Sequence, residues 1–430
     1  MRSASALSRR PGTAGGWHRP RATRDRAAVR CGDVDPELDD DRWLTALVMG
    51  GTVFVALTDE AIPQGPLISK IAGVLLLAFA LPRLLRGTLP LPPLRGVLLP
   101  LAGFATFSLL SLVWSVDPDA TALRARHLVM EALLLGALAA SWSPRGRDAV
   151  ALAGALVAGV LAVGFGLEAL SPEGARLRPF GLHPNLAARD ALLAGLLGTL
   201  LSPRLPPWGA PLIAAVAGIS VGASFSSGAL LASVAVAMVL LADRRWRPTI
   251  GGLLLGVVLG SGVLLASAER APRLRTPATA LRGNAVEEVG SGRLVLWGHA
   301  LRVTAAHPVL GAGAGTFPEA MEPIRIAHQR AGGEHSKPRR RAHNSFLETL
   351  AETGLLGLLL FAAPFGWLAR TAWRRRNAVA GAFVAYAATA SMTDSVLQQK
   401  SLWLALGIGA LMTGERDRPT TAPPSPPPST

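Results

Sequence analysis

Residues 148–170, DAVALAGALVAGVLAVGFGLEAL, decide the fold class, because residues 149–167 of this stretch carry no charge. About 20 mainly apolar residues are needed for an α-helix to cross the hydrocarbon core of a bilayer. Similar runs recur along the 430-residue chain, which is 50% hydrophobic and has a mean hydropathy of +0.37. The length alone would allow two or three soluble domains. The apolar runs instead predict an all-α, polytopic integral membrane protein.

About twelve transmembrane helices are predicted from these runs. The closest pair is separated only by Phe225, where Ser224, Ser226, Ser227 and Gly228 suit a turn. The predicted spans are 43–60, 66–85, 97–115, 125–142, 148–170, 186–202, 208–224, 226–242, 249–267, 346–369, 378–394 and 399–414.

Charge supports this count. The formal net charge is +15, but the charges lie in short blocks between apolar runs. Such blocks are typical of topology signals and not of a nucleic-acid-binding face. With a cytoplasmic N-terminus, every inside loop is basic and three short outside loops are acidic, namely those with Asp59-Glu60, Asp117 to Asp119 and Asp394. We therefore predict an inner (cytoplasmic) membrane protein with both termini in the cytoplasm. The outside exceptions are Arg124, Arg126, Arg176, Arg178 and Lys400.

Three regions follow. Residues 1–42 and 415–430 are predicted to be disordered cytoplasmic tails on either side of a membrane domain over 43–414. Within that domain, residues 268–345 form one large extracytoplasmic loop with 12 Lys+Arg, 6 Glu and five of the eight histidines. Two interpretations stay open, a solvated loop attracted to anionic lipid or an anion-binding site. Cys31 is the only cysteine, so an internal disulfide is excluded.

The end of this loop carries the strongest chemical pattern. Arg339, Arg340 and Arg341 run into Ala342-His343-Asn344-Ser345, where Asn344 or Ser345 suits the N-cap of a helix. Neighbouring arginines favour the neutral imidazole that a general base requires. A lone histidine beside a basic loop is more often an ordinary surface residue. Glu348 and Glu352 share a helix face, where they either complement the helix dipole or orient His343.

Several motifs share one order and one predicted side of the membrane. They are His343-Asn344-x-x-Leu347-Glu348 followed by Glu352-x-Gly354-Leu355-x-Gly357; Gly292-Arg293-x-x-x-Trp297; His307-Pro308-x-x-Gly311-x-Gly313-x-Gly315-x-Phe317; Arg178-Pro179-Phe180-Gly181-x-x-Pro184-Asn185; and Trp114 to Pro118. Together they resemble the O-antigen ligase/polymerase family, polytopic bacterial proteins that act on undecaprenyl-diphosphate-linked glycans. The chain departs from the family at Ser226-Ser227, where the family often has Ser-Arg.

The resemblance implies a metal-independent glycosyltransferase of the cell envelope without a cofactor. Its partners would be an undecaprenyl-diphosphate-linked glycan donor, a glycan or glycolipid acceptor such as lipopolysaccharide core, and membrane lipid, with no nucleic acid. We predict His343 as the catalytic base, Arg178 and Arg293 as the ligands of the diphosphate, and Asn344, Glu348 and Glu352 as supporting residues. Metal ligands are predicted to be absent.

Four functions stay open. A ligase transfers a finished polymer, a polymerase joins repeat units, and a protein O-glycosylating enzyme uses Ser or Thr as the acceptor. A solute transporter is the alternative from another class, and it should have polar or broken helices at mid-membrane. The predicted spans carry few charges, with Glu131 and Arg189 as exceptions near span ends, which favours an enzyme. A nucleotide site at Gly311, Gly313 and Gly315 is disfavoured, because no strand precedes them and no Lys-Ser/Thr follows.

Overall fold

The computed structural model describes residues 37–60, 65–85, 91–170, 177–201, 204–270, 293–332 and 340–415, and every element in these ranges is helical. The predicted all-α class is confirmed for this part of the chain. The elements are α1 Glu37–Thr58, α2 Gly65–Leu85, α3 Leu91–Leu110, η1 Ser111–Val113, α4 Pro118–Ala140, α5 Pro144–Leu170, η2 Pro179–Gly181, α6 Pro184–Leu201, α7 Gly209–Ser224, α8 Ser227–Leu241, η3 Arg244–Trp246, α9 Arg247–Arg270, α12 Arg293–Ala306, α13 Phe317–Arg330, α14 Ser345–Arg374, α15 Ala378–Thr393 and α16 Lys400–Glu415.

Each of the twelve predicted spans falls on a helix. Four segments of the described chain are long and apolar enough to cross a membrane, namely Pro93–Val113, Pro144–Leu170, Arg244–Ser267 and Ser345–Arg374. Shorter apolar helices occupy Trp43–Thr58, Leu67–Pro82, Gly209–Ser224, Ser227–Leu241 and Ala378–Thr393. The twelve-span count stays a prediction.

The borders of the predicted regions need adjustment. Helix α1 begins at Glu37, inside the predicted disordered tail 1–42. The tails 1–36 and 416–430, and residues 271–292 and 333–339 of the predicted loop, lie outside the described residues. The described parts of that loop form α12 and α13, and the expected turn between α7 and α8 is present. Phe225 adopts the left-handed conformation there (φ 50°), and the Ser226 side chain caps α8.

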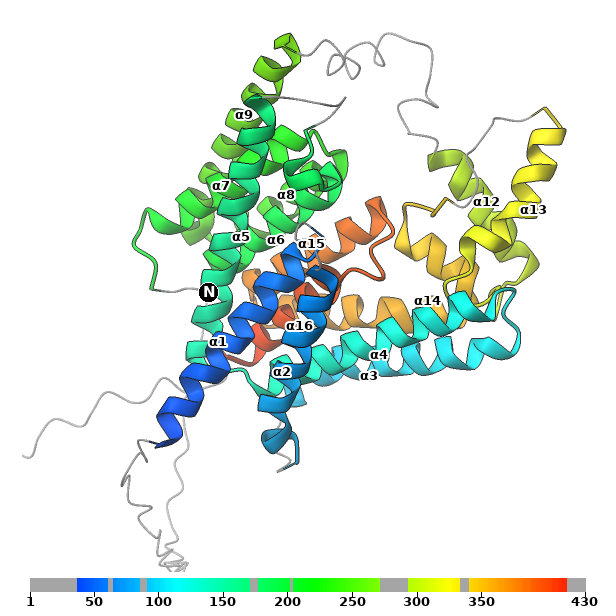
Figure 1. Cartoon of the computed structure of the whole chain (residues 1–430), viewed down its shortest axis with the longest axis horizontal. Coiled ribbons are helices and arrows are strands. Elements are labelled where there is room, and N and C mark those ends of the chain that lie inside the picture. Colours follow the sequence, from blue (N-terminus) through cyan, green and yellow to red (C-terminus); the bar gives the residue numbers. More distant parts are fainter. Residues whose placement is uncertain are drawn as a thin grey trace, which may run out of the picture.

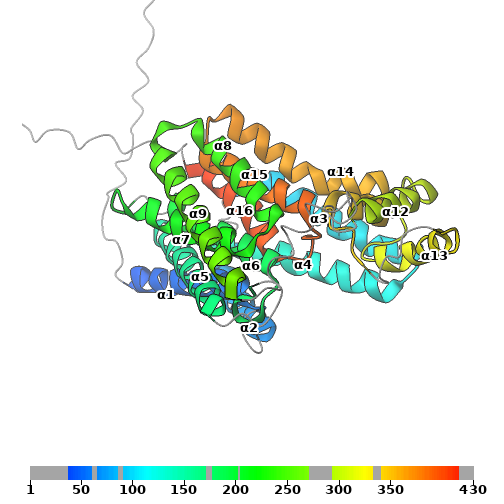
Figure 2. The ribbon, with the colours of Figure 1, turned by 90° about the horizontal axis from the view of Figure 1, so that it is seen from above.

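Two helix groups surround a buried centre. Helices α3, α4 and α14 run side by side toward α12 and α13, while α5, α6, α7 and α9 form the second group (Figures 1 and 2). Nearly every side chain of α16 is buried, as expected of a helix that is apolar all round. Helix α16 lies at this centre, and it contacts both α1 and α15.

Helices α7 and α9 pack through glycines. A Cβ atom added to Gly256 would lie 2.0 Å from the carbonyl oxygen of Ala215, and one on Gly260 would lie 2.1 Å from that of Ile219. Small residues four apart let helix backbones approach closely within a membrane. This contact joins α7 and α9 within the second group.

Candidate functional site

The site is built around His343, the residue that precedes the start of α14. The Asn344 side chain caps this helix by accepting hydrogen bonds from the backbone N–H groups of Phe346 and Leu347, so the predicted N-cap is confirmed. His343 itself adopts a left-handed conformation (φ 51°), which a non-glycine residue adopts only when its surroundings hold it. Its backbone N–H donates to Ser395 Oγ at 3.1 Å. The turn therefore has one fixed shape.

The imidazole of His343 pairs with a carboxylate that follows α15. Its Nδ1 atom lies 2.9 Å from Asp394 Oδ1, and Asp394 Oδ2 lies 3.0 Å from Nη1 of the buried Arg189. Burial would raise the pKa of Asp394, but the hydrogen bond from His343 and the positive charge of Arg189 hold it well below its ordinary value.

An ionised carboxylate can only accept hydrogen bonds, so Nδ1 of the neutral ring must carry the proton. The Nε2 atom is then the proton acceptor. The side chain of His343 is 40% exposed, so the ring is open to solvent in part.

The two glutamates of α14 share one arginine. Arg124 of α4 reaches Glu348 Oε1 and Glu352 Oε1, each at 3.5 Å, and all three side chains are buried. Glu348 also accepts a hydrogen bond from Ser395 Oγ, the same oxygen that accepts from the His343 backbone. Glu348 thus acts on the backbone of His343 through Ser395, and the imidazole is oriented by Asp394.

Arg341 links the basic run to the segment after α15. Its guanidinium donates to Gln398 Oε1 at 2.6 Å and lies 3.6 Å from Glu348 Oε1. These contacts tie the segment before His343 to Gln398 and to Glu348 of α14. The basic run thus serves in part as an internal support.

The glycine-rich motif of the loop packs against a break in α14. Gly354 has φ 62° and ψ −164°, which interrupts the helix. Backbone N–H groups of Ala312 and Gly313 donate to Ala351 and Glu352, and that of Leu355 donates to Pro308. A Cβ atom on Gly311 would lie 2.2 Å from the Glu352 backbone. The glycines therefore let the backbones of the two segments pack directly against each other.

Arg293 lies at the start of α12, on a helix that contacts the site. Trp297, four residues later and hence on the same helix face, donates a hydrogen bond from Nε1 to the carbonyl oxygen of Ala342 at 3.0 Å. Ala342 directly precedes His343. The motif that contains Arg293 is therefore anchored beside the histidine.

Arg178 belongs to another segment of the chain, before α6. It is exposed and directly precedes η2, which leads into α6. No hydrogen bond or ion pair joins Arg178 to His343 or Arg293 in the described ranges. Its role in binding a diphosphate stays a prediction, as does that of Arg293.

Sequence reasoning missed Asp394 as the partner of His343 and Arg189 as the partner of Asp394. It also missed Arg124 as the partner of the two glutamates. Arg124 and Lys400 were outside exceptions to the positive-inside pattern, and Arg189 was a charge within a predicted span. Lys400 proves to pair with Asp59. A positive charge on the wrong side, or inside a span, was the signal that each had a structural partner.

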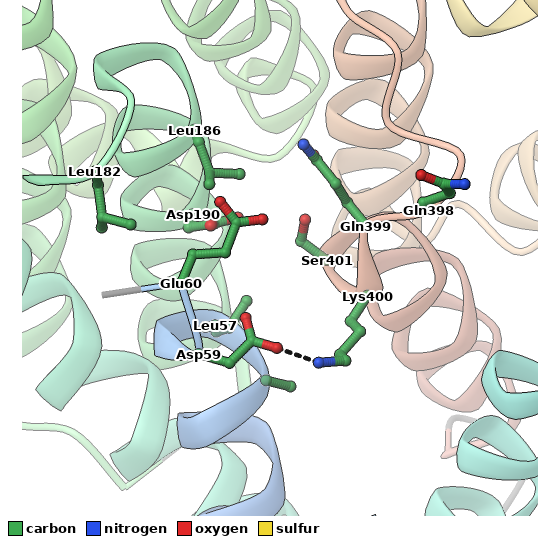
Figure 3. A pocket seen from close by; sticks show the side chains of 11 residues that line it. Leu57, Asp59, Glu60, Leu182, Leu186, Asp190, Gln398, Gln399, Lys400 and Ser401 are labelled. Atoms are coloured by element: carbon green, nitrogen blue, oxygen red, sulfur yellow. Dashed lines mark hydrogen bonds and ion pairs between the residues drawn. The ribbon is translucent and has the colours of Figure 1, made fainter. Parts of the chain in front are cut away.

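A cavity adjoins this site at the start of α16. It encloses about 420 Å³ of empty space, counting its open mouth. Its lining residues come from the end of α1, from α6 with the loop before it, and from the segment entering α16 (Figure 3). They are Ala56, Leu57, Asp59, Glu60, Leu182, Leu186, Asp190, Gln398, Gln399, Lys400 and Ser401.

The described residues contain no group of three or more His, Cys, Asp or Glu side chains that could hold a metal ion. Among the curated proteins, none matches the chain. Residues 212–362 match the family described as O-antigen ligase, a stretch from α7 into α14 that includes Arg293, His343, Glu348 and Glu352. Residues 212–362 are therefore an O-antigen ligase family domain, and the resemblance indicated by the motifs is confirmed.

Proposed function

We propose that this protein is an O-antigen ligase-like glycosyltransferase that moves a glycan from undecaprenyl diphosphate to an acceptor hydroxyl during surface polysaccharide assembly. The observation that carries the proposal is the chain of contacts from Arg189 through Asp394 to Nδ1 of His343. It leaves Nε2 as the proton acceptor of a partly exposed ring. The reaction would take place at the outer face of a twelve-span inner-membrane protein with cytoplasmic termini.

In this mechanism the acceptor oxygen attacks the anomeric carbon of the donor sugar. The bond from that carbon to the diphosphate oxygen breaks, and the diphosphate leaves with the electron pair. The acceptor proton moves to Nε2 of His343 as the new glycosidic bond forms. The imidazolium that results is stabilised by the Asp394 carboxylate across the Nδ1 hydrogen bond, so the proton transfer does not leave an isolated charge.

The departing diphosphate needs positive charge that does not titrate. Arginine supplies bidentate donors and keeps its charge, and we assign this role to Arg293 and Arg178. Arg293 has the stronger support, because Trp297 on the same face of α12 contacts Ala342 beside His343. Preorganised charge of this kind is often the largest contribution to catalysis. No step calls for a metal ion or an organic cofactor.

The test is transfer by the full chain in lipid nanodiscs, with undecaprenyl-diphosphate-linked polymer and acceptor glycolipid. We expect His343→Ala to insert normally and lose transfer, with Asn377→Ala, a substitution at the cap of α15 opposite the site, as the control for folding. Product at the wild-type rate from His343→Ala would refute the assignment of the base.

A polymerase of the same family would use the same donor and the same base, and the deletion strain separates the two. Full-length polymer that accumulates on lipid diphosphate identifies a ligase, and single repeat units identify a polymerase. Solute flux without glycan transfer in the same nanodisc preparation, reconstituted into vesicles, would instead favour a transporter.

A further inference from the structure

The cavity at the start of α16 has two unlike polar walls. Asp59, Glu60 and Asp190 line one wall, and Gln398, Gln399 and Ser401 line the opposite one (Figure 3). Leucines from α1 and α6, with the loop before α6, complete the lining. Carboxylates and amides facing each other across a partly apolar floor suit a ring that carries several hydroxyl groups.

Asp190 indicates that a ligand donates hydrogen bonds here. The residue is only 8% exposed, and its Oδ1 atom has no hydrogen-bond partner, although Ser401 bonds to the same carboxylate. Buried polar atoms in folded proteins are almost always hydrogen-bonded, so an orphaned carboxylate oxygen on a residue that lines a cavity suggests a donor from a bound molecule or water. A sugar hydroxyl is such a donor.

Charge decides which sugars fit. The ammonium group of Lys400 contacts Asp59 and lies 2.7 Å from Ser69 Oγ, so it neutralises one of the three carboxylates. Lys400 is the one cationic residue among the eleven that line the cavity, and its charge is already paired with Asp59, so the lining offers an anion no further positive charge to bind. A diphosphate or an acidic sugar is therefore disfavoured, whereas a neutral hydroxylated ring is not.

The cavity is joined to the site of His343 through two neighbouring residues. Gln398 lines the cavity and accepts a hydrogen bond from Arg341. Asp190 follows Arg189, whose guanidinium pairs with Asp394, the partner of His343. A ring bound in the cavity would thus lie beside residues that contact the neighbours of the proposed base.

We infer that this cavity is a subsite for a neutral sugar of the acceptor, with Asp190, Glu60 and Gln399 as the groups that receive and donate its hydroxyl hydrogen bonds. The assignment of this sugar to the acceptor rests on the proposed function. The binding of a neutral sugar in the cavity is inferred independently of that function.

Binding is tested by saturation-transfer difference NMR on the full chain in nanodiscs. The probes are the methyl glycosides of glucose, galactose, mannose and N-acetylglucosamine, with methyl glucuronide as the acidic counterpart. We expect saturation transfer to at least one neutral probe and none to the glucuronide. Asp190→Asn should weaken that binding at least tenfold, and Gln399→Ala should weaken it as well.

Two controls separate this inference from the proposed function. Asp119→Asn changes an exposed carboxylate at the start of α4 and should leave binding unchanged. His343→Ala should abolish transfer but keep sugar binding. Equal binding by wild type and Asp190→Asn, no binding of any neutral probe by wild type, or equal binding of the glucuronide would each overturn the subsite, even if transfer depends on His343. If the wild-type protein binds a neutral sugar but transfers no glycan, the result would support the subsite and count against the proposed reaction.

Discussion

Asp394→Asn is the sharpest test of the proposed chemistry, because it changes the partner of the imidazole without changing its size. In the wild-type protein an ionised carboxylate 2.9 Å from Nδ1 requires the proton on that nitrogen. An asparagine amide can present an N–H to Nδ1 and so stabilise the opposite tautomer, in which Nε2 carries the proton. The ring would remain in place but could no longer accept the acceptor proton.

The expected loss is the contribution of a general base, about 10²–10⁴-fold in rate. The central value, a thousandfold loss, corresponds to about 4 kcal/mol of transition-state stabilisation. Arg189 would also lose its negative partner, but the amide oxygen can occupy the position of Asp394 Oδ2, 3.0 Å from Nη1 of Arg189, so the fold should survive.

The assay is transfer of radiolabelled glycan at saturating donor, with kcat and the KM for the acceptor measured separately. We expect kcat to fall and the acceptor KM to change by less than threefold. Ser345→Ala, which removes a neighbouring hydrogen bond to the backbone oxygen of Asp394, serves as a matched control and should lose far less. A kcat within threefold of the wild-type value in Asp394→Asn would refute the tautomer argument.

Other predictions concern charge and packing. Arg293→Lys should reduce transfer at least tenfold in the nanodisc assay, because a point charge replaces a bidentate fork; full activity would contradict the bidentate role. Arg124→Ala leaves two buried glutamates without their shared partner and should lower the free energy of unfolding by about 3–5 kcal/mol, as measured by thermal unfolding in detergent; Arg126→Ala is the matched control and should change little. Gly354→Ala places a Cβ atom 2.2 Å from the Val309 oxygen at a φ of 62° and should cost about 1–3 kcal/mol by the same measurement. The pKa of Asp394 is depressed in the folded protein, so the stability that its charge contributes is fully present above the ordinary aspartate pKa of about 3.9 and is lost as the pH falls below that value. The thermal unfolding midpoints of wild type and Asp394→Asn should therefore converge only below about pH 3.9. Convergence already between pH 7 and 5 would contradict this prediction.

The elements of the fold follow closely from the apolar runs. Every predicted span lies on a helix, because about 20 apolar residues in succession have few alternatives to a helix in lipid. The start of α1 at Glu37 was not predicted, because the acidic residues at that point carry no apolar signal. How the helices pack was also out of reach, since it depends on close contacts such as that of Gly256 with Ala215.

The site was predictable only where its residues are consecutive. His343, Asn344 and Glu348 belong to one motif, and a helix cap can be predicted from a few neighbouring residues. Asp394 and Arg189 lie far from His343 along the chain, and a single sequence does not show which distant residues are in contact. The one indication was the charge of Arg189 within a predicted span, which topology did not explain.

The joint between residues 307–313 and the break at Gly354 is made of backbone groups alone. It demands glycine at 311 and 354, but it places no requirement on Val309 and Leu310, whose side chains are exposed. A connection made by backbone groups tolerates many substitutions at the neighbouring positions, and it still keeps the two chain segments in register. An engineered exchange of residues 309–310 for any uncharged pair should therefore leave the geometry around His343 intact, which makes this short stretch a natural place for a label or a spectroscopic probe.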